Sequence, residues 1–271
     1  MNLMSAELSE NQFRKISRIV HRLCGIHLKD GKQALVRARL MKRLRALKLC
    51  DFGEYIRLIE SPEGQEELGF MVDVMTTNKT SFFREPEHFN YLCERILPDL
   101  DARRLRFWTA ACSSGEEPFS LAVALREHLS DPRGRDVKIL ATDISTRMLE
   151  RARRAVYSEE LVRGVPPKYL QQYFERVRDN GVPAYRVRAD LRAMVRLGWL
   201  NLMDPWPMRG PFNVIFCRNV MIYFDRPTQQ RLIQRFWEIL EPGGYLFVGH
   251  SEGLSAVSHR FHYVRPAVYR K

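Results

Sequence analysis

The sequence predicts an α/β protein in which a mainly parallel sheet follows an all-helical N-terminal domain. Three observations indicate this. Helical patterns alone fill residues 1–75, strands and helices alternate over 105–271, and shorter alternating strands interrupt that rhythm at about 157–198. Alternation of strands and helices is typical of a parallel sheet covered by helices on both faces. We therefore expect two domains, with a small antiparallel β-subdomain inserted into the second.

Start and stop signals place four helices in the N-terminal domain. The first follows a capping box and ends at a glycine, and the third follows a capping aspartate. The fourth begins with proline, which is tolerated where the first helical N–H needs no partner. Ser9 with Gln12 starts the first helix and Gly25 ends it, and the second helix covers about 30–49. Asp51 with Glu54 caps the third helix, and Ser61-Pro62 starts the fourth.

In the second domain, short apolar strands are each followed by a loop and an amphipathic helix. Residues 261–271 are short enough to return as an antiparallel edge strand. The expected strands are 105–112, 137–143, 212–219 and 245–251, and the expected helices are 119–129, 145–156 and 227–240.

The insertion is expected to contain a short helix over 167–175 and a turn at Asn180-Gly181. Alternating apolar and polar residues predict strands over 184–190 and 193–199. We expect these strands to pair antiparallel and to form the β-subdomain.

The composition is globular, with an excess of basic charge. The net charge is +12 and the pI is near 9.7, so we expect an acidic partner, either nucleic acid or an acidic protein surface. No apolar run approaches the roughly 18 residues needed to span a bilayer, and no signal peptide is recognisable, so we expect a cytoplasmic protein without membrane insertion. The five scattered cysteines and seven histidines form no zinc pattern, so reduced thiols and no metal site are expected.

A turn of small residues between the first strand and its helix predicts a ligand site. Residues 110–115 read Ala-Ala-Cys-Ser-Ser-Gly, and small residues at the carboxyl end of a strand let a ligand approach the backbone. Glu116 and Glu117 follow, and carboxylates at a helix start repel a phosphate and attract a cation. No G-x-G-x-x-G and no Walker lysine is present. A positively charged nucleoside such as S-adenosylmethionine fits this pattern, and an ordinary strand–helix turn is the alternative.

Two further strand ends carry polar residues. Asp143 ends the second strand, where an acid can bind the two ribose hydroxyls. It could instead only cap the next helix, a role that Ser145 could also take. Residues 217–220 read Cys-Arg-Asn-Val, not the Asn-Pro-Pro-Tyr that methyltransferases acting on amino nitrogens of bases tend to carry. This favours a different acceptor.

Six stretches, in order along almost the whole chain, resemble the CheR family of chemoreceptor glutamate methyltransferases. The resemblance implies a Rossmann-like S-adenosylmethionine-dependent methyltransferase fold over 105–271, a helical domain over 1–75, and a linker and cofactor-covering segment over 76–104. The stretches are TTNKTSFFRE (76–85), WTAACSSGEEPFSLA (108–122), ATDIS (141–145) with a later Met-Leu, NL (201–202), FCRNVMIYFD (216–225) and L-x-PGGYLFVGHSE (240–252).

The resemblance also implies the reaction, which is methyl transfer from S-adenosylmethionine to side-chain carboxylates of specific glutamates on a receptor's cytoplasmic helices. The products are glutamate methyl esters and S-adenosylhomocysteine. A glutamate is ionised at pH 7, so its attack on a methyl group needs no general base, and positioning groups suffice. Carried over position by position, the cofactor contacts fall on Asn78, Thr80, Arg84, Glu117, Asp143, Asn201, Leu202, Arg218 and Asn219.

In this family Arg84 and Tyr223 are thought to lie beside the sulfonium and to orient the acceptor. The alternatives are that Arg84 pairs with Glu85 or Glu87 on the surface, and that Tyr223 is a buried aromatic near a strand end. We also expect Phe82 and Phe83 to pack where the two domains meet, and so to hold Arg84 and its neighbours over the cofactor.

The expected helix at 30–49 has a basic face, and residues 31–50 include no acid. Such a face is often only solvated. In the light of the resemblance, we expect it to dock on the acidic methylation region of a receptor coiled coil. The apolar arc consists of Val36, Leu40, Met41, Leu44 and Leu47, and the expected receptor-binding residues are Lys32, Arg39, Lys42, Arg43 and Arg45.

Two other functions stay open. The basic charge would suit an S-adenosylmethionine-dependent RNA methyltransferase, although no nucleic acid is expected as partner, and a lost active site would leave a non-catalytic S-adenosylmethionine-binding regulator. In one branch of the family the β-subdomain binds a receptor C-terminal peptide through a Gly-rich loop. Residues 175–188 contain a single glycine, which argues against peptide tethering here. Nothing in the sequence demands more than a monomer.

Overall fold

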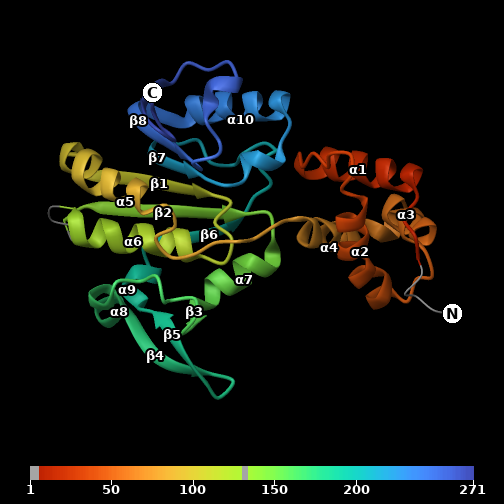
Figure 1. Cartoon of the computed structure of the whole chain (residues 1–271). Helices are drawn as coiled ribbons and strands as arrows, with labels where there is room; N and C mark the ends of the chain where they lie inside the picture. Colours follow the sequence, from red (N-terminus) through yellow and green to blue (C-terminus); the bar gives the residue numbers. More distant parts are fainter. Residues whose placement is uncertain (1–5, 130–133) are drawn as a thin grey trace. The chain divides into compact units, whose positions relative to one another are not determined.

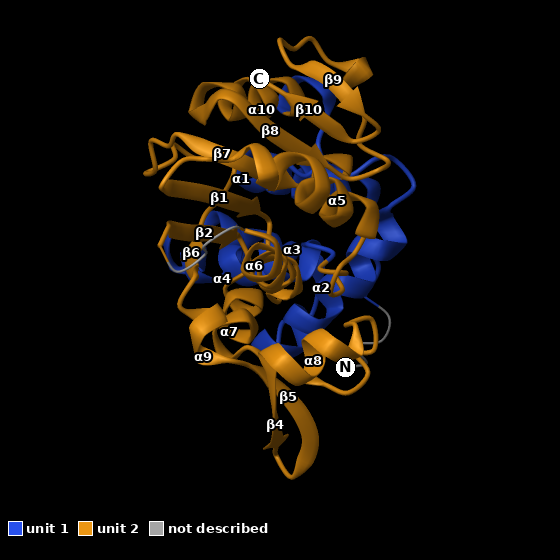
Figure 2. Ribbon diagram, turned by 90° about the vertical axis from the view of Figure 1, so that its left-hand side faces the viewer, with its two compact units in different colours: residues 1–77, 223–228 blue, residues 78–222, 229–271 orange. Residues whose placement is uncertain are grey.

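The structure, a computed structural model, describes residues 6–129 and 134–271 and divides into two compact units (Figure 2). The predicted domains over 1–75 and 105–271 each include a few residues, 1–5 and 130–133, that lie outside the described part. Unit 1 consists of Met1–Thr77 and Tyr223–Thr228, and unit 2 of Asn78–Ile222 and Gln229–Lys271.

Unit 1 is helical, and its start and stop signals act as predicted. Ser9 and Gln12 form the capping box, and Gly25 ends the first helix in the left-handed conformation, with φ 73°. The Asp51 carboxylate accepts a hydrogen bond from the backbone N–H of Glu54. The elements are α1 (Glu10–Cys24), α2 (Gln33–Leu47), α3 (Phe52–Glu60), the 3-10 turn η2 (Pro62–Gly64) and α4 (Gln65–Met75).

Helix α2 is shorter than the predicted 30–49 and is held mainly by its apolar face. Its N-cap residue, Lys32, makes no capping hydrogen bond, and its first turn carries no acid, so the helix start has little local stabilisation. The apolar arc packs against unit 1 as predicted, with Leu47 half-buried. The buried members are Val36, Leu40, Met41 and Leu44.

Residues 223–228 belong to unit 1 although they are distant from it in the sequence. The backbone N–H of His27 donates to the Tyr223 carbonyl at 2.7 Å, and Ile26 and Phe224 form an isolated antiparallel bridge. Nε2 of His21 lies 2.9 Å from a carboxylate oxygen of Asp225, which is 204 positions later in the chain. The helical unit is therefore completed by a late segment of the chain.

Unit 2 is built on a seven-stranded sheet of order β6-β2-β1-β7-β8-β10-β9 (Figure 1). The first five of these strands pair in parallel, and β10 is antiparallel to both of its neighbours. Every residue of β7 is buried, as expected for a strand covered on both faces. The strands are β1 (Arg104–Ala110), β2 (Asp136–Asp143), β6 (Val195–Trp199), β7 (Phe212–Cys217), β8 (Leu240–Val248), β9 (His262–Arg265) and β10 (Val268–Arg270).

The helices of unit 2 follow the predicted alternation, and one further helical stretch precedes the sheet. Residues 86–99 form this stretch, and Phe89, Leu92, Ile96 and Leu97 within it lie in the core. The helices are α5 (Pro86–Tyr91), the π-helical η3 (Leu92–Ile96), η4 (Leu97–Asp99), α6 (Glu116–His128), α7 (Thr146–Arg154) and the short turn η6 (Leu254–Ala256). The turn η5 (Met221–Tyr223) and α10 (Arg226–Ile239) also belong largely to this unit, although residues 223–228 are part of unit 1.

The inserted subdomain is a three-stranded antiparallel sheet, but one of its predicted strands was placed wrongly. Residues 193–199 contain β6, which lies at the edge of the main sheet and runs parallel to β2. An edge strand exposed on one face alternates in the same way as an antiparallel strand, so the pattern could not separate the two. The subdomain elements are β3 (Val156–Ser158), α8 (Pro167–Tyr173), β4 (Phe174–Asp179), β5 (Val182–Val187) and α9 (Ala189–Arg192).

The C-terminal stretch 261–271 forms two strands rather than the single predicted edge strand. A turn at Pro266-Ala267, with Ala267 at φ 64°, separates β9 from β10. Strand β10 lies between β8 and β9, so β9 is the edge strand of the sheet.

Candidate active site

The predicted cofactor residues of unit 2 lie at the carboxyl ends of its parallel strands. The chain passes from β1 to β2 on one side and later enters β7 on the other, and ligands of open α/β sheets bind at such a reversal of strand order. Glu117 opens the helix after β1, Asp143 ends β2, Asn201 and Leu202 follow β6, and Arg218 and Asn219 follow β7.

Asp143 is not the cap of the following helix. Ser145 takes that role, because its hydroxyl accepts the hydrogen bond from the Met148 N–H. The buried Asp143 carboxylate accepts 2.8 Å hydrogen bonds from the N–H groups of Ser113 and Ser145. These two contacts fix the orientation of the carboxylate at the end of β2, and its predicted contact with the ribose hydroxyls remains a prediction.

The loop between β1 and α6 is held in a strained conformation that requires small residues. Ala111, Ser113 and Gly115 have φ values of 71°, 49° and 101°. A Cβ at Gly115 would lie 2.7 Å from the Tyr157 hydroxyl oxygen, so only glycine fits there. Positive φ at non-glycine residues concentrates at ligand sites, which supports the predicted role of this loop.

The two glutamates at the start of α6 have different environments. Glu116 is buried, and its carboxylate accepts a 2.7 Å hydrogen bond from the Ser114 hydroxyl. Glu117 pairs with Nη1 of Arg218 at 3.1 Å. Burial raises the pKa of the Glu117 carboxyl to about 6, against the opposing effect of the Arg218 guanidinium. Glu117 is therefore mostly ionised at neutral pH, as a ligand for a positively charged nucleoside has to be.

Arg218 connects the strand end to the segment that precedes α5. Only 1% of its side chain is exposed, and Nη2 lies 3.1 Å from the Glu85 carboxylate while also donating to the Arg84 carbonyl oxygen. The same guanidinium pairs with Glu117. Arg218 thus positions Arg84 and Glu117 relative to each other.

Asn219 and the turn after it are fixed by Glu252, a residue that the sequence reasoning missed. The Glu252 carboxylate is buried and accepts hydrogen bonds from the backbone N–H groups of Asn219 (2.5 Å), Gly249 (2.7 Å) and Ile222 (3.0 Å). Asn219 itself has φ 60° and donates from its side chain to Glu85 at 3.2 Å. In the sequence, Glu252 is the last residue of the stretch VGHSE. That stretch was part of the resemblance to the CheR family, but no role was assigned to Glu252.

Asn201 and Leu202 are both buried at the end of β6. The Asn201 side chain accepts a hydrogen bond from the Met203 N–H and donates to Asp204, which forms a turn. Their predicted contact with the cofactor remains a prediction.

The segment 78–84 lies beside the β1 loop. The Asn78 carbonyl accepts a 3.2 Å hydrogen bond from the Ser113 hydroxyl, and Thr80 is half-buried. Arg84 donates from Nη1 to the Lys79 carbonyl at 2.7 Å. Within the described residues, Arg84 forms no ion pair with Glu85 or Glu87, so the surface-pair alternative is wrong.

The two phenylalanines of this segment pack inside unit 2 rather than at a boundary between domains. Phe82 is buried and makes edge contacts with Tyr157 and Phe174, at centroid distances of 4.9 and 5.4 Å. Phe83 contacts Phe89 and lies near a tyrosine of α8. The expectation of a domain interface is therefore corrected, because the insertion supplies the aromatic partners.

Tyr223 is half-buried and belongs to unit 1, whereas Arg84 belongs to unit 2. Its position is fixed on both sides. Its carbonyl accepts from His27, and the preceding residue, Ile222, is held by Glu252.

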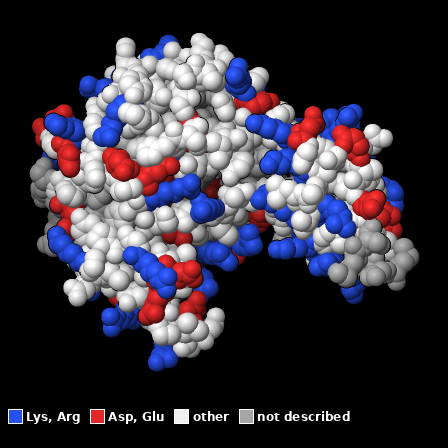
Figure 3. Space-filling model, viewed as in Figure 1, with Lys and Arg blue, Asp and Glu red and all other residues white. Residues whose placement is uncertain are grey.

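The predicted receptor-binding residues of unit 1 divide into two groups. Arg39 donates to the Met75 carbonyl and the Thr77 hydroxyl, and Arg43 makes a two-pronged ion pair with the buried Glu67. The others, Lys32, Lys42 and Arg45, are exposed and have no ion-pair partner in the described part of the chain. Figure 3 shows many Lys and Arg atoms on the surface of the molecule that it draws.

The parallel sheet with acidic residues at its strand ends is typical of Rossmann-like S-adenosylmethionine-dependent methyltransferases. Two family models match the chain: the CheR methyltransferase SAM-binding domain over residues 78–269, and the CheR methyltransferase all-alpha domain over residues 11–76. The chain therefore belongs to the CheR methyltransferase family.

Several relatives match over nearly the full length of this chain. The chemotaxis protein methyltransferase of Klebsiella aerogenes is 42% identical over 265 residues, which cover 97% of this chain and 90% of that protein. The one from Escherichia coli K12 is 43% identical, with 94% and 88% covered. The probable chemotaxis protein methyltransferase of Rhizobium etli is 41% identical, with 91% and 94% covered.

All five cysteines are free thiols in the structure, and Cys24, Cys112 and Cys217 are buried. Among the described residues, no helix combines the length and the apolar character needed to cross a membrane.

Proposed function

We propose that this protein methylates side-chain carboxylates of specific glutamates on the cytoplasmic helices of chemoreceptors, with S-adenosylmethionine as the methyl donor. The match of both family models, and of relatives named chemotaxis protein methyltransferases, carries this proposal. The acidic crevice supports it, because Glu117 and Asp143 suit a positively charged nucleoside better than a phosphate. The protein acts as a cytoplasmic monomer.

The chain's own residues bind and orient, and none has to remove a proton. Bound S-adenosylmethionine supplies an electrophilic methyl group, and the acceptor glutamate is already ionised. Asp143 accepts from the ribose hydroxyls, Glu117 attracts the positive charge of the donor, and Asn78, Thr80, Asn201, Leu202 and Asn219 line the site. Arg84 and the Tyr223 hydroxyl orient the acceptor carboxylate, and no metal takes part in the transfer.

Receptor recognition is assigned to the exposed basic face of α2, with Lys32, Lys42 and Arg45 at its centre. Arg39 and Arg43 support this face from within unit 1, because their guanidinium groups are already engaged. An acidic helical surface is the complementary partner, and charges of this kind mainly raise the rate of encounter.

The test is incubation with labelled S-adenosylmethionine and a receptor cytoplasmic fragment. We expect base-labile label on the fragment, as a carboxyl methyl ester requires, and its loss when the acceptor glutamate is changed to alanine. Label on RNA alone would replace the proposal by the RNA methyltransferase. Binding of S-adenosylmethionine without transfer to either substrate would favour the regulator.

A further inference from the structure

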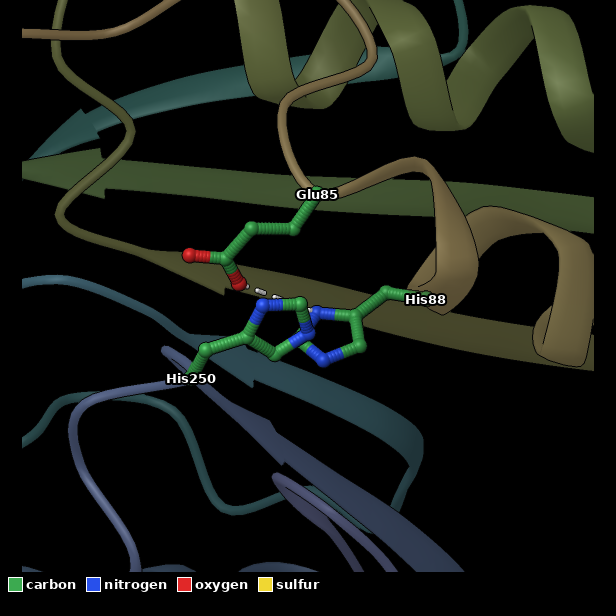
Figure 4. Close-up of side chains that lie close together, drawn as sticks. All are labelled: Glu85, His88 and His250. Atoms are coloured by element: carbon green, nitrogen blue, oxygen red, sulfur yellow. Dashed lines mark ion pairs between the residues drawn. The ribbon is translucent and has the colours of Figure 1, made fainter.

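Three side chains with metal-binding donor atoms converge in unit 2 outside the predicted site. Glu85 precedes α5, His88 lies in its first turn, and His250 follows β8 (Figure 4). One donor atom from each lies within 4.8 Å of the others. The Glu85 carboxylate is 3.4 Å from Nδ1 of His88. Glu85 is the N-cap residue of α5, with φ 55°, so its side chain approaches His88 from the turn before the helix, and the third ligand comes from far along the chain.

His88 is an unusual buried side chain. It is 1% exposed, and neither ring nitrogen has a hydrogen-bond partner among the described residues. Oε2 of Glu85 is likewise buried without a hydrogen bond, although it faces Arg218. Burying an unsatisfied polar group is unfavourable, so a ligand atom that bonds to these groups would stabilise the folded protein.

We propose that Glu85, His88 and His250 bind a divalent transition-metal ion, with Zn²⁺ as the best fit. Two imidazoles and one carboxylate are a common zinc donor set, whereas Mg²⁺ and Ca²⁺ prefer oxygen ligands. Ligand atoms around tetrahedral zinc lie about 3.4 Å apart, which the Glu85–His88 pair already matches. His250 is exposed, so it can rotate to close the remaining distance, and it leaves an entry path and a position for water.

The contacts of Arg218 determine how a bound ion would affect the cofactor site. Its Nη2 lies 3.1 Å from the Glu85 carboxylate, so the ion has to compete with a guanidinium for that ligand. Binding would therefore be weaker than at a structural zinc site, and it would withdraw Glu85 from Arg218. The same guanidinium holds Glu117 and the Arg84 carbonyl, so metal occupancy should disturb the cofactor crevice and inhibit methyl transfer. This consequence rests on the proposed function, whereas metal binding itself does not.

Metal binding is tested by equilibrium dialysis of the chelator-treated full chain against Zn²⁺ in excess Mg²⁺. A Cys50→Ser background removes the exposed thiol as a competing ligand. We expect one Zn²⁺ per chain, and at least about tenfold weaker binding for His250→Ala, whose exposed position makes misfolding a minor concern. His262→Ala, an exposed histidine on β9, is the matched control and should bind as the parent does.

Equal zinc affinity in His250→Ala and the parent, or no stoichiometric binding, would overturn the proposal. Co²⁺ provides a second readout, since tetrahedral coordination by nitrogen and oxygen gives visible bands without a thiolate charge-transfer band. S-Adenosylhomocysteine affinity is then measured with and without Zn²⁺. Unchanged affinity would overturn the inhibitory consequence, and failure of receptor methylation without metal would instead count against the proposed function.

Discussion

Arg218 and Glu117 form a buried pair of opposite charges at the centre of the strand ends. Removing one member of such a pair leaves the other charge uncompensated, so both residues affect stability as well as ligand binding. Substitutions at Arg218 would therefore confuse the two effects. Arg84 offers a clearer test because its side chain lies outside this pair. Glu117→Gln is the milder change within the pair, because glutamine keeps the side-chain shape and Glu85 still pairs with Arg218.

Arg84→Ala should lower kcat for receptor methylation by about 100-fold or more, because the acceptor carboxylate loses its orienting group. The melting temperature should change by less than about 2 °C, since among the described residues the hydrogen bond of the Arg84 side chain goes to a backbone carbonyl. Lys79→Ala is the matched control and should keep full activity, because its carbonyl remains. Activity of Arg84→Ala within a few-fold of the parent would contradict the orienting role.

The raised pKa of Glu117 predicts how the affinity for the cofactor depends on pH. Its folded pKa is raised to about 6, so the carboxylate loses its charge as the pH falls through that value. We expect the Kd for S-adenosylmethionine to increase about fourfold between about pH 7.5 and about pH 5.5, measured by titration calorimetry. Glu117→Gln should bind more weakly at neutral pH and lose most of this dependence. A variant that keeps the full dependence would show that another group titrates.

At the scale of secondary structure, local signals were predictable and pairings were not. Ser9, Asp51 and Gly25 act as expected because capping depends on a few neighbouring residues. Strand β6 was misassigned because its partner is chosen by the sheet, not by its own pattern. The same reason hid the contacts of Glu252 and His250, whose partners lie far away in the sequence.

Strand ends were more predictable than individual contacts. Parallel strands bring their carboxyl ends to one edge, so Asp143 and Glu117 could be assigned to one crevice from the sequence alone. The role of Arg218 as a link to Arg84 and Glu85 could not be predicted from the sequence, because it depends on how the segment before α5 packs.

The turn held by Glu252 leaves no room for a side chain at Gly249. A Cβ there would lie 2.5 Å from Nδ2 of Asn219 and 2.6 Å from the Glu252 carboxylate. Gly249→Ala should therefore lower the free energy of unfolding by about 1–3 kcal/mol and reduce activity by displacing Asn219. Gly198→Ala in β6, where the nearest atom is 4.0 Å away, is the control and should change stability by less than about 1 kcal/mol, measured by denaturant unfolding. Similar losses in both variants would contradict this explanation.

At the scale of the whole molecule, the net charge of +12 leaves open which basic residues meet the partner. The structure separates exposed from engaged groups. Arg43 pairs with the buried Glu67 and stacks on Phe70, and the hydrogen bond to Glu67 raises its pKa, so it belongs to the packing of unit 1. Lys42 and Arg45 are exposed.

Reversing the exposed charges of α2 should therefore weaken receptor encounter without unfolding the protein. For Lys32→Glu, Lys42→Glu and Arg45→Glu combined, we expect the KM for a receptor fragment to increase about tenfold at low salt with kcat nearly unchanged. The difference should shrink as salt is added. Arg153→Glu, Arg186→Glu and Arg192→Glu combined change the net charge equally on unit 2 and serve as the control. An equal loss in that variant would contradict docking on α2.

Unit 1 contains paired residues that are translated at widely separated times. Ile26 and His21 are translated well before their pairing partners, Phe224 and Asp225. At bacterial elongation rates the delay is on the order of ten seconds. During that interval Ile26 and His27 lack the partners that they have in the folded chain, Phe224 and the Tyr223 carbonyl. The native contacts of unit 1 are therefore complete only after residues 223–228 have been translated.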